Sequence, residues 1–382
     1  MLLSKFLVTS NFLLRYNFLC AILTFIMEKK YKLAEFFSGP GGFAFGAKKA
    51  IIKDKKNNTH SIEHSWASDY DEDSCKTYKK NINVNKVFCE NVKNFFELVD
   101  LKKIKLPKFN CFAYGFPCND FSNVGEKKGI KGKFGPLYSY GVELINRYKP
   151  IWFIAENVGG IKSSNEGRAF KKILNDLGSA GKGYELTVHK YKFEEYGIPQ
   201  SRHRIIIVGI KKELKIKFKV PKPNFRFVTS RQALKNIPKN SKNNELTNNS
   251  KKVVSRLKYI KPGKSAFNSS LPKHLKLNVK GAKISQIYRR LDPNKPSYTV
   301  TGSGGGGTHV YHWKENRALT NRERARLQTF PDHFIFSGSK ESVRKQIGMA
   351  IPCLGAKIIV EAVLKSLAKV DYPSIKSNLN QI

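Results

Sequence analysis

Residues 31–43 read YKLAEFFSGPGGF, an apolar run that ends in a glycine-rich turn. This pattern is typical of a strand that passes through a tight turn into a helix. The glycines let a ligand approach the backbone closely, and the first turn of the helix points N–H groups at a negative charge. Because Gly39-x-Gly41-x-x-Ala44 also fits the dinucleotide fingerprint, an oxidoreductase, a methyltransferase and a turn without a ligand all remain open.

Further short apolar runs follow this turn and alternate with helical stretches, which predicts an α/β fold. Several runs are almost continuously apolar, as expected of parallel strands that are buried on both faces, so we expect a mostly parallel sheet. Ligands of such sheets bind at the carboxyl ends of the strands. The predicted strands are Tyr31–Phe37, His64–Ser68, Asn110–Tyr114, Ile151–Ala155 and Arg204–Ile210.

The composition of the chain changes from about Lys211, where prolines and polar runs become frequent. A polar segment, Ser241–Lys252, and a glycine stretch, Gly302–Gly307, indicate a smaller, loop-rich second domain. We expect short strands at Ser297–Thr301 and His309–Trp313 within it.

Two helices near the C-terminus carry clear signals. Thr320 and Glu323 have the spacing of a capping box, and Pro331 ends the helix that they begin. A last helix is expected from about Cys353 to Lys369, with Pro352 at its first turn.

The charge of the chain favours an anionic partner. Seventy Lys and Arg stand against 29 Asp and Glu, a net charge of +41 over 382 residues. An excess of this size costs self-repulsion, and it favours nucleic acid as the partner over an anionic membrane surface. The six cysteines are scattered without zinc or disulfide spacing, so we expect a reduced cytoplasmic protein without a metal site.

Residues 1–26 are apolar and differ from the rest of the chain. A signal sequence or a membrane anchor is one interpretation. Lys5 and Arg15 interrupt the run, and no small-residue cleavage site follows it, so we favour an upstream leader and a natural start at Met27.

Polar residues that are candidates for a role in catalysis follow the predicted strands. Cys118, in the segment GFPCNDFS, is placed as an accessible nucleophile, although a half-buried cysteine of no consequence has the same appearance. Glu156 follows an apolar strand, where partial desolvation would raise its pKa and suit it to act as an acid; the alternative is a helix-capping residue. Arg202 and Arg204 can anchor a phosphate or a carbonyl oxygen, or can be simple surface charge.

The order of these segments closely resembles the C5-cytosine DNA methyltransferase family. FSGPGGF, GFPCNDFS, ENV, QSRHR, RALTNRERARLQTFPD and IGMAIP follow one another across about residues 31–365, with a variable region between Lys211 and Lys295. The resemblance implies a Rossmann-like, S-adenosylmethionine-dependent catalytic domain over residues 27–220. It implies a target-recognition domain and hinge over 221–342, and a segment, 343–375, that returns to the catalytic domain.

In this family the thiolate that corresponds to Cys118 adds to C6 of cytosine, which makes C5 able to take a methyl group. The resemblance gives Glu156 a contact to N3 of the base and Arg204 a contact to its O2. Arg202 would support this site. Pro117, Asn157, Gln200 and Thr299 would help to hold the base or the loops around it.

The resemblance also implies binding of S-adenosylmethionine over the glycine turn, with S-adenosylhomocysteine as the product. Asp69 would contact the ribose and Tyr70 the adenine. Asn91 stands where the family usually has an acid that faces the adenine amino group, and Glu90 beside it is the alternative for this contact. Met349 replaces the usual Asn and removes a polar group, so we expect weaker cofactor binding without loss of activity. The other predicted cofactor residues are Phe37, Ser38, Gly39, Gly41, Gly42, Pro117, Leu137 and Ala350.

The family implies further properties of the whole protein. We expect a monomer that flips a cytosine out of duplex DNA, in a bacterial type II restriction–modification system with a cognate endonuclease as functional partner. His274, Lys276, Arg289 and Arg290 are candidate readers of the target bases. A tRNA cytosine methyltransferase is the closest alternative. An NAD-dependent oxidoreductase would explain the glycine turn but none of the other segments. A catalytically inactive DNA-binding relative would lack the nucleophile. The only support for a membrane-tethered protein is the apolar segment 1–26.

Overall fold

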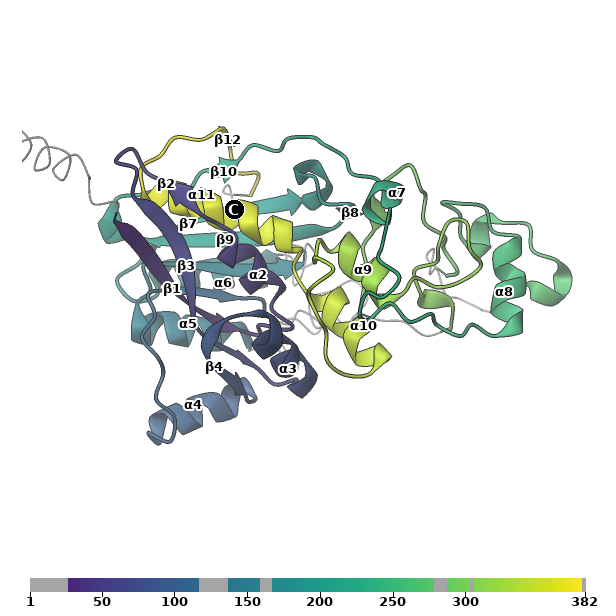
Figure 1. Ribbon diagram of the computed structural model, residues 1–382. Helices are drawn as coiled ribbons and strands as arrows, with labels where there is room; N and C mark the ends of the chain where they lie inside the picture. Colours follow the sequence, from purple (N-terminus) through teal and green to yellow (C-terminus); the bar gives the residue numbers. More distant parts are fainter. Residues whose placement is uncertain (1–26, 117–136, 159–166, 278–286, 303–305, 380–382) are drawn as a thin grey trace, which may run out of the picture.

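A central eight-stranded sheet dominates the computed structural model, which describes residues 27–116, 137–158, 167–277, 287–302 and 306–379. The strand order is β2-β3-β1-β5-β6-β9-β7, and β4 pairs with the far end of β3 (Figure 1). The strands are β1 Glu28–Phe36, β2 Ile52–Lys53, β3 Thr59–Asp69, β4 Val84–Cys89, β5 Cys111–Tyr114, β6 Trp152–Val158, β7 Tyr184–Lys192 and β9 His203–Lys211.

All five strands predicted in this part of the chain are confirmed, and the sheet is mostly parallel through β4, β3, β1, β5 and β6. The strand predicted at Arg204–Ile210 lies in β9, which runs antiparallel to both β6 and β7. A short 3₁₀ turn, Phe193–Tyr196, follows β7, so the chain reverses there without a crossover helix. The sequence patterns missed β4 and β7 because polar residues interrupt their apolar positions.

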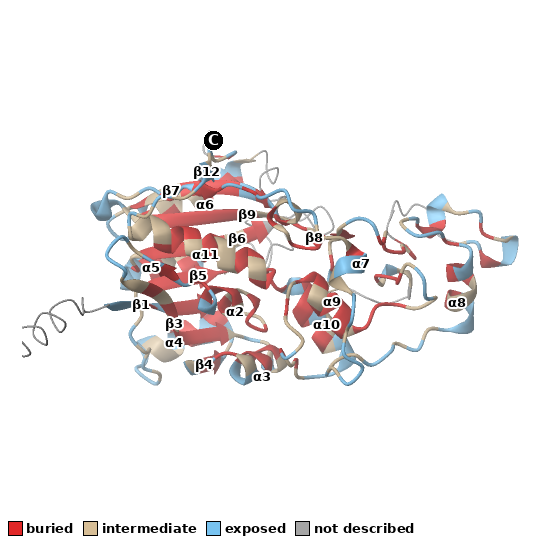
Figure 2. Ribbon diagram, turned by 45° about the horizontal axis from the view of Figure 1, so that its top comes forward, coloured by how far each residue is buried: buried red, intermediate tan, exposed pale blue. Residues whose placement is uncertain are grey.

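Helices cover both faces of the sheet. One apolar cluster places α4, α5 and α6 on one face, and a second cluster places α2 and α11 on the other, with α3 packed beside α2. The central strands β5, β6 and β9 are largely buried between them (Figure 2). The helices are α2 Gly42–Lys48, α3 Glu72–Asn81, α4 Val92–Asp100, α5 Leu137–Tyr148, α6 Arg168–Ser179 and α11 Cys353–Leu367.

The described residues between 222 and 349, here called the second lobe, lie beside the sheet rather than on one of its faces (Figure 1). Regular structure is sparse there, and two smaller apolar clusters form its core. Its elements are α7 Ser230–Ala233, α8 Lys251–Lys258, β11 Ser297–Tyr298, α9 Asn321–Leu327 and α10 Lys340–Met349, with short 3₁₀ turns at Ala266–Asn268, Lys273–Leu275 and Gly306–Thr308.

The two predicted helices near the C-terminus are confirmed. Both hydrogen bonds of the capping box between Thr320 and Glu323 are present at the start of α9. The predicted strand at Ser297–Thr301 is the shorter β11, which pairs with β8, Gln200–Ser201. The strand predicted at His309–Trp313 is wrong: Tyr311 makes only isolated bridges, and the carbonyl oxygen of His312 accepts from the Arg290 side chain.

The C-terminal segment returns to the part that contains the sheet, here called the sheet body (residues 27–221 and 353–379). β12, Ser374–Ile375, pairs with β10, Val220–Pro221. The predicted division between residues 342 and 343 falls inside helix α10. Residues 1–26, with their predicted leader, lie outside the described residues.

One helical stretch of the described chain, Lys340–Leu367, is long and apolar enough to cross a membrane. Within this stretch, 72% of the most apolar 18-residue segment is buried inside the protein, as in a core helix of a folded domain. It comprises α10 and α11, which pack against both parts of the molecule.

Candidate active site

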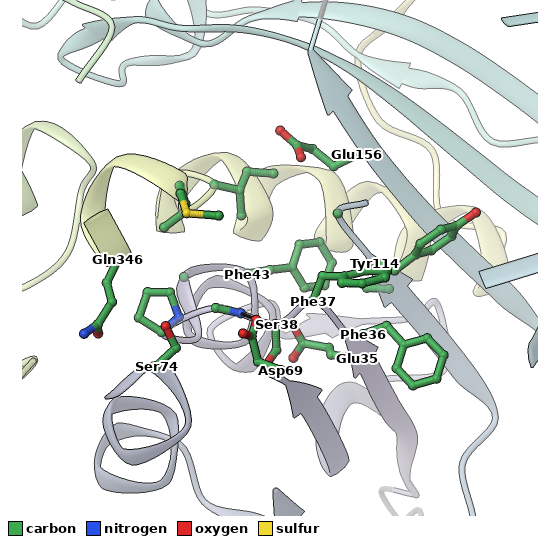
Figure 3. A pocket seen from close by; sticks show the side chains of 18 of the residues that line it. Glu35, Phe36, Phe37, Ser38, Phe43, Asp69, Ser74, Tyr114, Glu156 and Gln346 are labelled. Atoms are coloured by element: carbon green, nitrogen blue, oxygen red, sulfur yellow. Dashed lines mark hydrogen bonds between the residues drawn. The ribbon is translucent and has the colours of Figure 1, made fainter. Parts of the chain in front are cut away.

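A cavity of about 970 Å³, counting its solvent-filled mouth, opens at the carboxyl ends of β1, β3, β5 and β6. This is the edge of the sheet at which the sequence predicted a ligand. Gln346 and Ser74 lie at one end of the cavity and Tyr114 at the other, with Ser38 and Asp69 between them (Figure 3). The remaining lining residues are Glu35, Phe36, Phe37, Gly39, Pro40, Gly42, Phe43, Tyr70, Asp71, Ala113, Gly115, Ile154, Glu156, Lys345, Met349, Ala350 and Ile351.

The glycine turn forms the floor of the cavity, and its glycines serve different purposes. Gly39 and Gly41 have φ angles of +53° and +94°, which side chains rarely adopt. A Cβ on Gly39 would meet nothing within 4 Å, so the backbone there faces open space. A Cβ on Gly41 would lie 3.0 Å from the ring of Tyr78, and one on Gly42 would lie 2.7 Å from the carbonyl oxygen of Ile351. Gly39 therefore exposes backbone to a ligand, whereas Gly41 and Gly42 allow close packing beneath it.

Asp69 holds the glycine turn in place from the end of β3. Its Oδ2 accepts a hydrogen bond from the N–H of Gly39 at 2.8 Å, and its Oδ1 accepts one from Asp71 at 3.0 Å. Burial raises the pKa of Asp69, and these backbone N–H bonds oppose the shift. The carboxyl group thus faces the cavity while it orients the turn.

Helix α10 of the second lobe provides the opposite wall of the cavity through Lys345, Gln346 and Met349. The ammonium group of Lys345 lies 5.8 Å from the centre of the Tyr70 ring and 4.0 Å from Asp71 Oδ2. Tyr70 itself is 59% exposed, so its ring offers a free face to a flat ligand. The cavity is therefore shared between the sheet body and the second lobe.

Glu156 and Arg204 form an ion pair at the edge of the cavity. Arg204 Nε lies 2.9 Å from Glu156 Oε1, and both side chains are largely buried. Glu156 belongs to β6, within its pairing with β9, so the predicted loop position after the strand is wrong: the strand extends to Val158. The pairing of β6 with β9 brings the segments ENV and QSRHR together.

Asn157 donates a hydrogen bond from Nδ2 to the carbonyl oxygen of Phe116 at 3.4 Å. Phe116 immediately precedes Pro117 and Cys118 in the chain. The expected link between the ENV segment and the cysteine loop is therefore present up to this residue. Pro117 and Cys118 lie outside the described residues.

Arg202, Gln200 and Thr299 join the two parts of the molecule. Arg202 is 2% exposed and donates to the carbonyl oxygens of Val300 and Gly348 at 3.2 and 3.1 Å. Gln200 bonds to the backbone of Val300 and Leu327 and to the side chain of Gln328, and Thr299 donates to the carbonyl oxygen of Ser201 at 2.7 Å. These contacts lie inside the protein, so the three residues act on the site indirectly, through the backbone segments that they join.

Two predicted cofactor residues lie away from the cavity lining. Asn91 is exposed and caps helix α4, where its side chain accepts from the N–H of Lys93. Leu137 packs against the core on the face of α5. The other described cofactor residues line the cavity, except Gly41, which supports the turn from below.

Arg290, a candidate reader of bases, is 4% exposed and bonds to backbone carbonyl groups inside the second lobe. It is buried because loops without regular pairing need donors, so a direct contact of Arg290 to bases is ruled out in this arrangement. Arg289 stacks on Tyr298 at 4.7 Å, and His274 and Lys276 are exposed.

Sequence reasoning missed Glu35, a buried acid that lines the cavity and accepts a hydrogen bond from Tyr78 at 2.7 Å. Its position two residues before Phe37 in the quoted turn was the available signal. Lys345 and Gln346, next to the segment IGMAIP, were also missed. Among the described residues, no group of three or more His, Cys, Asp or Glu is arranged to hold a metal ion.

Comparison with known proteins defines the class. The C-5 cytosine-specific DNA methylase family matches residues 31–365, and the chain belongs to this family. It is a DNA (cytosine-5-)-methyltransferase.

Individual relatives agree over most of the chain. It is 56% identical over 357 residues to type II methyltransferase M.BbvI of Brevibacillus brevis. This alignment covers 91% of this chain and 94% of the relative. It is 38% identical over 346 residues to type II methyltransferase M.NgoFVII of Neisseria gonorrhoeae, with 88% and 87% covered. A putative DNA modification methyltransferase of an Escherichia coli prophage has the same fold, with a TM-score of 0.67 at 23% identity over 88% of this chain and 99% of its own.

Proposed function

We propose that this protein methylates C5 of one cytosine within a short sequence of duplex DNA, as the modification enzyme of a type II restriction–modification system. The observation that carries the proposal is a single cavity that joins the glycine turn to Glu156, which is paired with Arg204. Both close relatives reported above carry the name of type II methyltransferases. Protection of host DNA against a cognate endonuclease, in the bacterial cytoplasm, is part of this proposal.

The residues of the cavity fit S-adenosylmethionine. The open space above Gly39 lets a ligand lie against the backbone, and Asp69 is placed to accept hydrogen bonds from ribose hydroxyl groups. The exposed ring of Tyr70 is suited to stack on an adenine. Phe37, Ser38, Gly42, Met349 and Ala350 complete the lining, and Met349 presents no polar group there. When bound, this cofactor supplies an electrophilic methyl group.

The chemistry at the base needs a nucleophile, because C5 of cytosine is a poor nucleophile by itself. We assign the addition to C6 of the base to the Cys118 thiolate. Glu156, in its protonated form, would donate to N3 and Arg204 would donate to O2, so the charge that develops on the ring is met by two groups that their mutual contact already orients. After methyl transfer, a base removes the C5 proton and the Cys118 thiolate leaves by elimination.

Access to C6 requires that the cytosine leave the helix, so we include base flipping in the proposal. Residues 221–342 would act as the target-recognition domain and hinge, with His274, Lys276 and Arg289 as its accessible candidates. The net charge of +41 supports phosphate contacts, so DNA affinity should fall steeply with salt. Recognition by one such region is compatible with a monomer.

Incubation of unmethylated plasmid DNA with the purified protein and S-adenosylmethionine, followed by bisulfite sequencing, tests the function. We expect complete protection of one cytosine within a recurring short sequence. Transfer RNA transcripts in a parallel reaction should stay unmodified, and their modification in place of DNA would support the tRNA alternative. DNA without any protected cytosine, from a protein that binds S-adenosylhomocysteine, would contradict the proposal.

A substitution tests the assigned nucleophile. Cys118→Ser should abolish methyl transfer and leave DNA binding in place, because the hydroxyl group is a much weaker nucleophile than a thiolate. Cys89→Ser, a change of an exposed cysteine on β4, is the matched control and should retain full activity. Turnover by Cys118→Ser at the wild-type rate would refute the covalent mechanism.

A further inference from the structure

Helices α3 and α10 are joined by a closed ring of buried hydrogen bonds at one end of the cavity. Thr77 donates from Oγ1 to Gln346 Oε1 at 2.7 Å and accepts from the N–H of Ser337 at 2.9 Å. Gln346 completes the ring with a bond from Nε2 to the carbonyl oxygen of Ser337 at 2.8 Å. Thr77 and Gln346 are 0% and 3% exposed.

A second contact lies one helical turn further along α3. Asn81 donates to the carbonyl oxygen of Ile335 and accepts from its N–H, both at 2.8 Å. Residues four apart lie on the same face of a helix, so Thr77 and Asn81 both hydrogen-bond to the backbone of one stretch of the second lobe. That stretch leads directly into α10.

The cavity depends on the distance between these same two helices. Ser74 of α3 lines one side of it, and Gln346 and Met349 of α10 line the other. Met349 is 59% exposed, and the contact of Lys345 with Asp71 is long at 4.0 Å. The ring around Thr77 is therefore a fully buried link between α3 and the α10 wall at this end of the cavity, separate from the bond of Arg202 to Gly348.

We propose that Thr77, Asn81 and Gln346 form a latch that positions the α10 wall and thereby sets the affinity for the cofactor. The inference rests on the proposed function of the cavity. Thr77 and Asn81 act through α10 and are positioning residues. Loss of the Thr77 hydroxyl group leaves Gln346 Oε1 and the N–H of Ser337 without this partner, so the wall loses its fixed spacing.

Calorimetric titration with S-adenosylhomocysteine, in the absence of DNA, tests the latch on the full chain. Thr77→Val should raise the Kd about fivefold or more, the equivalent of one net hydrogen bond. Thr77→Ser retains the hydroxyl group and should restore the wild-type Kd within about twofold. Asn81→Ala, at a half-buried position, should raise the Kd in the same direction and covers the case in which Thr77→Val does not fold.

Thr187→Val is the matched control. Thr187 is also buried and donates one hydrogen bond, to the carbonyl oxygen of Phe218 at 2.9 Å, but it lies on β7 at the opposite edge of the sheet. This variant should lose stability without a change in Kd. Wild-type affinity in both Thr77→Val and Asn81→Ala would overturn the latch alone. A wild-type protein that binds no S-adenosylhomocysteine would overturn the cofactor assignment, and the latch with it.

Discussion

The sheet body and the second lobe provide hydrogen-bond partners for their buried backbone groups in different ways. In the sheet body the backbone pairs with itself along the strands, and continuous apolar clusters cover both faces. In the second lobe regular pairing is scarce, and buried arginines donate to the carbonyl groups of loops.

Arg290 and Arg322 show how this works. Each guanidinium group has several donors in a fixed plane, so one side chain can join separate loops. Burial lowers the pKa of both groups. Arg290 bonds to carbonyl oxygens of Leu257, Ile260, His312 and Glu315 and to Asn316, and Arg322 bonds to carbonyl oxygens of Lys242, Pro331 and Phe334.

The large positive charge of the chain therefore has two uses. Exposed lysines and arginines are available to phosphate groups, whereas Arg202, Arg256, Arg290, Arg322 and Arg324 are buried inside the protein. Net charge alone therefore overstates the number of groups that can meet DNA.

The largest effect is expected from removal of a buried arginine. Arg290→Met should lower the free energy of unfolding of the second lobe by about 4 kcal/mol, because several buried carbonyl groups lose their donor together. Arg289→Met, next to it and only half-buried, should cost about 1 kcal/mol. Urea unfolding followed by the fluorescence of Trp313, with Trp66 and Trp152 changed to Phe, reports the second lobe. Equal costs for the two arginines would contradict the comparison.

In the sheet body, close backbone packing is the sensitive feature. Gly46→Ala would place a Cβ 2.1 Å from the carbonyl oxygen of Cys353, and should cost about 3 kcal/mol as α2 is pushed from α11. Gly178→Ala, whose Cβ would make an ordinary contact of 3.5 Å with Leu186, should be stabilising by about 0.5 kcal/mol. Thermal unfolding checks both, and a neutral Gly46→Ala would show that the helix contact is not tight.

Each part also contains a histidine whose pKa burial lowers to about 4, His189 in β7 and His309 in the second lobe. The unfolded chain takes up the proton near pH 6.5, and the folded chain does so only near pH 4, so stability is full above pH 6.5 and is lost as the pH falls through this window. Between pH 6.5 and pH 5 each histidine should account for roughly 2 kcal/mol of that loss.

Two substitutions separate these contributions. His309→Gln should flatten the pH dependence seen by Trp313, and His189→Gln should flatten that seen by Trp66 and Trp152. Urea midpoints at pH 7.5 and pH 5 provide the measurement. An unchanged pH dependence in both variants would mean that neither histidine is neutral in the folded protein at pH 5.

The smallest effect concerns the capping box of α9. Thr320→Ala should cost about 1 kcal/mol, because the N–H of Glu323 loses its acceptor. Thr320→Ser should retain most of the stability. Denaturant titration distinguishes the two, and equal losses would indicate that the methyl group of Thr320 is what matters.

The sequence predicts the parts of the fold that local patterns encode. The glycine turn at residues 38–42, the five apolar strands and the Thr320 capping box all follow from short segments, because turn geometry and strand burial are local properties. The family resemblance also indicated several residues that line the cavity, among them Asp69, Tyr70 and Glu156, but it missed Glu35, Lys345 and Gln346.

Features that depend on distant pairing could not be read from the sequence. The antiparallel direction of β9, the extension of β6 through Glu156, and the burial of Arg290 all result from contacts between segments far apart in the chain. An arginine in a loop has the same local sequence pattern whether it faces DNA or a buried carbonyl group. The link between Thr77 and Gln346 joins residues 269 positions apart and has no local signal.

We propose that Cys118 attacks a flipped cytosine beside Glu156 and Arg204. Duplex DNA that carries 5-fluorocytosine at the target position tests it most directly, because fluorine cannot leave as a proton does and the adduct cannot eliminate. In the presence of S-adenosylmethionine, we predict a denaturation-resistant complex whose peptide map places the nucleotide on Cys118. Methylation of normal DNA without any such complex, or a complex at another residue, would contradict this mechanism.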